Sequence, residues 1–206
     1  MVNFTKKTMW ISFFIYSVLT ELLPGSNNIL ALNSTMAIGY KRSKFLLWGI
    51  YAGFTSVIFL SAIFTEMLSG SWSEIFNYLR YLGAAYLVYL AWSVVKSKPL
   101  HVNNLSEEHL VSNHKSDFWK GFFLQFVNVK IIIYGITAFS SFVLPNYQSI
   151  LIIICFSLFL SFIGSFATFI WAITGQQLNT FLNKHFLLVN RVMAILLIYC
   201  AISLFF

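Results

Sequence analysis

The residues best suited to chemistry interrupt the first long apolar stretch, in the run TELLPGSNNILAL that begins at Thr20. Pro24 cannot donate a backbone hydrogen bond and Gly25 relaxes the chain, so a helix should break here and leave backbone groups unpaired. Asn27 and Asn28 would begin a second half-helix, whose free N–H groups suit a carboxylate, while the carbonyls that end the first half suit an ammonium. The pattern predicts a site for an amino-acid zwitterion; a plain proline kink that shapes a helix bundle is the alternative.

A second polar interruption lies in the run LQFVNVKIIIYG, which contains Asn128 and Lys130. A lysine inside a membrane costs roughly 2.5–3.5 kcal/mol, so it should face the protein interior and have a partner. We expect Glu21 and Lys130 to pair, or to compete for substrate and proton, with Glu21 as the candidate for proton coupling. Carbonyls near Leu22 and Leu23, with Glu21, would then hold the ammonium. The alternative is that Lys130 snorkels to an interface.

The composition indicates what kind of molecule must position these residues. Of 206 residues, 59% are hydrophobic and only 9% are charged, against about a quarter charged in soluble domains. The net charge of +7 accompanies no basic stripe or recognition motif, so nucleic acid is not an expected partner. Most tryptophans, Trp171 among them, fall near expected helix ends and read as anchors at the membrane interface. The sequence therefore predicts an all-α integral membrane protein surrounded by a lipid bilayer.

Six stretches reach the roughly 20 apolar residues that a spanning helix needs. The first and fourth contain the polar interruptions, so we expect these two helices to be broken. The chain should be one transmembrane domain, residues 1–206, with a first half over about 1–95, a cytoplasmic loop over 96–117 and a second half over about 118–206. The expected spans cover about residues 9–36, 45–68, 75–95, 118–144, 149–174 and 186–206.

Lysine and arginine predict the orientation, because cytoplasmic loops carry an excess of both. With six spans, nine of these residues fall on one side and three on the other. The first side should be cytoplasmic, with both termini outside.

The two halves of the chain share an order of elements. Each half has a broken helix, a glycine-bearing helix and a helix entered by arginine, and Gly53 and Gly164 are 111 residues apart, as are Arg80 and Arg191. Three spans per half would insert in opposite orientations, and inverted repeats with corresponding broken helices are typical of transporters with a site near the midplane. Gly53 also closes a Gly-x-x-x-Gly motif with Gly49, which permits close helix approach inside the bundle or between subunits of a homo-oligomer.

Other classes of function find little support. A membrane redox relay would need paired reactive cysteines, but Cys155 and Cys200 lie in separate apolar runs and read as small buried hydrophobes. The spacing of His101, His109 and His114 fits no metal template. An intramembrane enzyme would need a nucleophile with a base, paired acids or metal ligands. We therefore expect no catalytic residue, no metal and no cofactor. A structural scaffold, the remaining rival, would not need two polar breaks.

Both interruptions carry motifs of a known family. The run PGSNN at Pro24 and the run NVK at Asn128 match the P-G-P-x-N and N-P-K-like motifs of the lysine-exporter (LysE) superfamily, and the chain resembles its homoserine/threonine-efflux (RhtB) branch over nearly its whole length. The run YLGAAYLVYLAW is similar to the family's third helix. The runs PGSNNILALNS, LQFVNVKIIIYGITAFSSFVLP and LLIYCAI resemble the family's cysteine/O-acetylserine exporters.

The resemblance implies proton-driven export of small amino acids or derivatives, such as cysteine and O-acetylserine, across the inner membrane of a bacterium. Homoserine or threonine is the alternative substrate. Ser26 replaces the usual second proline, which should loosen the break, and Glu21 stands where a small or apolar residue is expected. Together the residues and the resemblance predict a substrate-binding set of Pro24, Gly25, Asn27, Asn28, Asn128 and Lys130.

Overall fold

The computed structural model describes residues 2–69, 73–96 and 114–205, and every regular element in these ranges is helical. This confirms the predicted all-α class, since a helix satisfies its own backbone groups when the surroundings are apolar. The elements are α1 (Val2–Leu22), α2 (Ser26–Ile38), α3 (Tyr40–Ser69), α4 (Ser73–Lys96), α5 (His114–Phe126), α6 (Val129–Ala138), the π-helix η2 (Phe139–Val143), α7 (Ile150–Lys184) and α8 (Phe186–Ser203).

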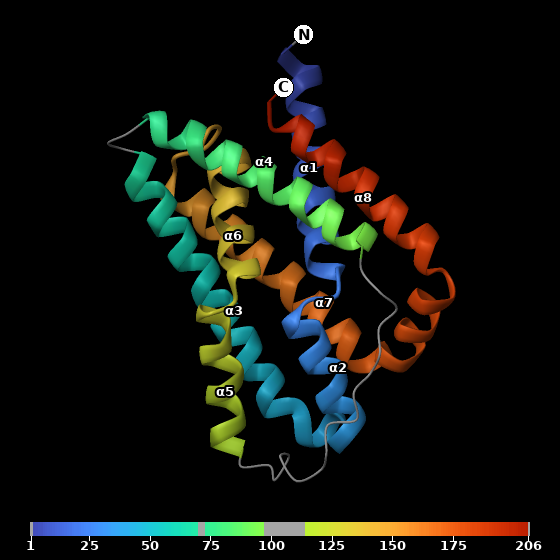
Figure 1. Cartoon of the computed structure of the whole chain (residues 1–206). Helices are drawn as coiled ribbons and strands as arrows, with labels where there is room; N and C mark the ends of the chain where they lie inside the picture. The colour runs from blue at the N-terminus through green and yellow to red at the C-terminus, as the bar shows by residue number, and fades with distance from the viewer. Residues whose placement is uncertain (1, 70–72, 97–113, 206) are drawn as a thin grey trace.

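The two predicted helix breaks are both present. Between α1 and α2, Gly25 is extended (φ −135°, ψ 174°) and α2 starts at the next residue. Between α5 and α6, Asn128 is extended, and its carbonyl accepts the first hydrogen bonds of α6, a position that asparagine favours over a helix interior. The axes of residues 116–126 and 129–143 differ by 55°. In Figure 1, α1 lies above α2 whereas α5 lies below α6, so the two broken helices run in opposite directions.

Among the described residues, two helices, over Tyr40–Leu68 and Ile150–Thr174, are long and apolar enough to cross a membrane, and the bent pair α5–α6 adds a third. Shorter apolar helices cover Met9–Leu22, Tyr81–Lys96 and Leu187–Ile202. The count of six spans therefore stays a prediction. The two ends of the chain lie at the same end of the bundle (Figure 1), as an even number of crossings requires.

Close packing of α3 on α5 fixes the position of the second break. A Cβ added at Gly49 would meet the Phe118 carbonyl, and one added at Gly53 would meet the Phe122 carbonyl. Gly121 of α5 likewise faces the α3 backbone. The glycine motif therefore serves an approach inside the bundle, one of its two predicted uses.

Gly53→Ala should accordingly destabilise the protein. The new methyl group would force α3 and α5 apart, at a cost of about 1–3 kcal/mol, which thermal unfolding of the purified protein in detergent would report. Ala85→Val adds bulk at an exposed position of α4 and should leave the melting temperature unchanged. Equal melting temperatures for Gly53→Ala and the parent protein would contradict the tight contact.

Aromatic side chains fill the core on the α1 side of the first break. Tyr16, Phe54, Tyr134 and Phe142 are at most 1% exposed. The rings of Tyr16 and Tyr134 stack with centroids 5.5 Å apart, and the Tyr16 hydroxyl donates to the Tyr134 carbonyl at 3.0 Å. These contacts fasten α1 to α6 close to the two breaks.

Some expectations need correction or lie outside the described residues. Cys155 is exposed rather than buried, whereas Cys200 is buried as expected. Helix α5 begins at His114, so the last four residues of the stretch 96–117 are helical, and 97–113, with His101 and His109, are not described.

Candidate functional site

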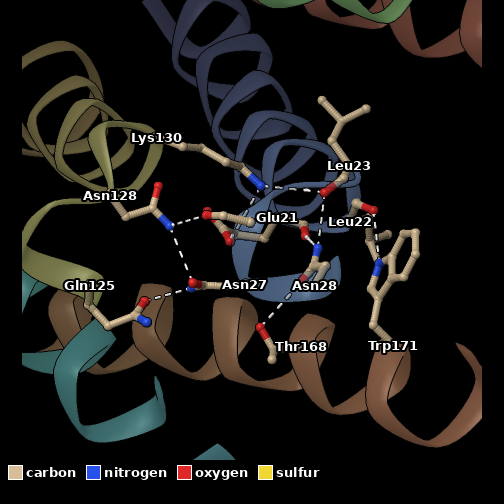
Figure 2. Close-up of polar contacts among 11 residues, drawn as sticks. Glu21, Leu22, Leu23, Asn27, Asn28, Gln125, Asn128, Lys130, Thr168 and Trp171 are labelled. Carbon is tan, nitrogen blue, oxygen red and sulfur yellow. Dashed lines mark hydrogen bonds and ion pairs between the residues drawn. The ribbon is translucent and has the colours of Figure 1, made fainter. Parts of the chain in front are cut away.

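The carbonyls freed at the end of α1 already have hydrogen-bond partners (Figure 2). Asn28 donates its amide hydrogens to the carbonyls of Glu21 at 2.7 Å and Leu23 at 3.0 Å. The carbonyl of Leu22 accepts from the indole nitrogen of Trp171 at 3.2 Å. The first break is therefore a built structure, in which side chains replace the lost helical hydrogen bonds.

A residue of helix α7 keeps Asn28 in position for these contacts. The Thr168 hydroxyl donates to Asn28 Oδ1 at 3.2 Å, and Thr168 and Trp171, three residues apart, share one face of α7. Sequence reasoning missed both residues, and it wrongly placed Trp171 at the membrane interface, since this side chain is fully buried. The T-x-x-W spacing was the one available signal.

The second break is joined to the first by side-chain amides (Figure 2). Asn128 Nδ2 donates to Ser26 Oγ at 2.8 Å and to Asn27 Oδ1 at 3.3 Å. Asn27 Nδ2 in turn donates to Gln125 Oε1 at 2.6 Å. Two segments about 100 residues apart in sequence therefore form one polar cluster, here called the break cluster, of Glu21 to Asn28, Gln125, Asn128, Lys130, Thr168 and Trp171.

The expected pairing of Glu21 with Lys130 is confirmed. Lys130 Nζ lies 3.9 Å from Glu21 Oε2, and the Glu21 side chain is almost wholly buried. Lys130 turns toward the break, not to an interface, and its side chain is 18% exposed. The second carboxylate oxygen, Oε1, is buried with no hydrogen-bond partner among the described residues.

The ammonium of Lys130 occupies the position that the sequence suggested for a substrate amine. Lys130 Nζ lies 3.5 Å from the Leu23 carbonyl, besides its contact with Glu21. It also packs over Gly25, where an added Cβ would lie 3.1 Å from Nζ. An incoming amine would therefore have to displace Lys130 from Leu23 and Glu21.

The start of α2 offers the complementary charge. Gly25 caps α2 through its carbonyl, and no side chain among the described residues accepts a hydrogen bond from the first N–H groups of this helix. Free N–H groups and the positive end of the helix dipole attract a carboxylate. Ser26 is exposed here, so an anion could reach this end. Within the described part of the chain, no group of three His, Cys, Asp or Glu residues is placed to hold a metal ion.

Comparison with known proteins places the chain in a family. Residues 18–206 match the family described as LysE type translocator. Cysteine/O-acetylserine efflux proteins of Escherichia coli O139:H28 (strain E24377A / ETEC), Escherichia coli (strain K12) and Shigella sonnei (strain Ss046) are 38%, 37% and 37% identical over 199 residues. The matches cover 97% of this chain and 98% of each relative. No solved structure matches the chain. The family is one of translocators rather than enzymes, and the chain belongs to it as a LysE type translocator.

Proposed function

We propose that the protein exports small amino acids of the cysteine and O-acetylserine type from the cytoplasm across the bacterial inner membrane, driven by the proton gradient. The observation that carries this proposal is the joining of two helix breaks around the Glu21–Lys130 ion pair. Relatives that span nearly the whole chain and bear the name cysteine/O-acetylserine efflux protein support the substrate class.

The substrate would bind within the break cluster. Its carboxylate would bind at the N-terminus of α2, and its ammonium would displace Lys130 from the Leu23 carbonyl and from Glu21. Lys130 would return to both groups after release and so close the cycle. Pro24 and Gly25 keep the break open, Asn27 and Asn128 hold the two breaks in register, and Asn28 pairs the carbonyls that end α1.

Alternating access would come from two inverted three-helix halves that rock against each other. Packing supports this arrangement, because α1 and α2 contact α7 while α5 and α6 contact α3, the exchanged partners that an inverted repeat requires. In the proposed repeat α3 corresponds to α7 and α4 to α8, and each of these helices contacts its counterpart. Six crossings with both termini outside complete the proposal.

Proton coupling is assigned to Glu21, because a carboxylate with one paired and one unpaired oxygen can take up a proton when neither Lys130 nor the substrate ammonium lies beside it. Glu21→Gln mimics the protonated form, so export by this variant should no longer change with pH. Glu66→Gln, a half-buried acid of α3, should keep the pH dependence of the parent protein. The measurement is the initial rate of export at a series of pH values, and a pH dependence that persists in Glu21→Gln would exclude Glu21 as the coupling group.

The function itself is tested with inverted membrane vesicles and a panel of labelled amino acids. Accumulation of O-acetylserine or cysteine that needs a proton gradient would support the proposal. Accumulation of homoserine or threonine instead would replace the proposed substrates by the alternative ones and leave export itself supported. Accumulation that does not depend on the proton gradient would exclude proton coupling but would still support export.

A further inference from the structure

A groove of about 380 Å³ opens between the first half of α3 and the middle of α7, outside the break cluster. Aromatic rings dominate its walls. Tyr40 and Phe169 meet edge to face with centroids 6.2 Å apart, and Phe162 stacks on Phe166 at 5.8 Å. Further along, Trp48 and Tyr51 complete an apolar lining.

Of the described residues that line this groove, Lys44 is the charged one. Lys41 and Arg42, also exposed, lie in the same first turn of α3. No acidic side chain in the described part of the chain forms an ion pair with Lys44, and its Nζ lies 5.1 Å from the Phe45 ring. The groove is therefore apolar along its length and positive at one end.

This pattern selects the class of ligand. A zwitterionic amino acid would need a negative group for its ammonium, and none of the described residues that line the groove supplies one. An anion with a long apolar tail matches both the aromatic walls and the lysine. For a protein in a membrane, the most abundant anionic amphiphile is a phospholipid, whose phosphate is attracted to lysine and arginine near the membrane surface.

We propose that the groove binds an anionic phospholipid, with one acyl chain against the aromatic walls and the phosphate at Lys44. Tyr40 and Trp48 belong to the residue types that lie at the level of lipid headgroups. Thr168 lines the groove and also donates to Asn28, so the bound chain would lie directly behind the wall of the break cluster.

The test measures, by native mass spectrometry, the binding of dioleoyl-phosphatidylglycerol and of dioleoyl-phosphatidylcholine to the purified full-length protein. The parent protein should retain the anionic lipid preferentially. Lys44→Gln should weaken its binding about fivefold, the effect of one cation near the surface, and leave phosphatidylcholine unchanged. Lys184→Gln, an exposed lysine at the end of α7, is the matched control and should bind as the parent does.

Ser165→Leu fills the groove beneath the aromatic walls and should weaken binding of the anionic lipid without touching its charge partner. Equal binding of both lipids by the parent protein would overturn the proposal. Equal losses in Lys44→Gln and Lys184→Gln would also overturn it, because they would indicate an effect of general surface charge. A dimer whose second copy covers the groove would overturn it as well. None of these outcomes depends on amino-acid export, so the proposed function is tested separately.

Discussion

Lys130→Met is expected to abolish export and to destabilise the protein in the absence of substrate. The substitution keeps the length and the apolar stem of the side chain but leaves Glu21 buried without its partner, at a cost of about 3–5 kcal/mol. O-acetylserine should raise the melting temperature of this variant more than that of the parent protein, because its ammonium replaces the missing charge beside Glu21 and meets no competitor. Thermal unfolding with and without O-acetylserine, alongside vesicle transport, measures both effects.

The double variant Glu21→Gln/Lys130→Met separates structure from function. With both charges gone, no buried carboxylate is left without a partner, so most of the lost stability should return while export stays lost. Lys120→Met removes an exposed lysine of α5 and should change neither quantity. Normal export by Lys130→Met would contradict the role given to this residue.

Asn28→Leu should have the second largest effect. The leucine leaves the Glu21 carbonyl and the Thr168 hydroxyl without their partner, and it leaves the Leu23 carbonyl only the longer contact with Lys130. Each unpaired buried group costs about 1–3 kcal/mol. We expect export to be lost and the melting temperature to fall, because the break can no longer hold its shape.

Asn33→Leu is the matched control for this variant, measured by the same unfolding and transport assays. Asn33 lies on the same helix, and its amide oxygen accepts no hydrogen bond from the described residues. Its replacement should leave stability and export close to those of the parent protein. If the two variants behaved alike, the hydrogen bonds of Asn28 would not be what maintains the break.

The helix breaks were predictable because their causes are local. Pro24 and Gly25 interrupt a helix through their own backbone chemistry, and Asn128 favours a helix start over a helix interior. The Glu21–Lys130 pair was predictable for another reason: few charges lie at that depth, and a buried charge needs a partner.

The contribution of α7 to the site could not be read from the sequence. Thr168 and Trp171 look like any hydroxyl and any aromatic residue of an apolar helix until tertiary packing brings them to Asn28 and Leu22. The proposed competition between Lys130 and a substrate amine also depends on geometry, because only the fold shows Nζ at the Leu23 carbonyl.

The central claim, that substrate binds where the two breaks meet, is tested most directly by thiol protection at Ser26. In a Cys155→Ala background, which removes an exposed thiol, Ser26→Cys is labelled with a maleimide in the presence and absence of O-acetylserine. Met67→Cys, at a position 74% exposed near the far end of α3, is the control. We predict that O-acetylserine slows labelling at position 26 and not at position 67. Labelling of Ser26→Cys at the same rate with and without O-acetylserine would contradict a substrate site between the breaks.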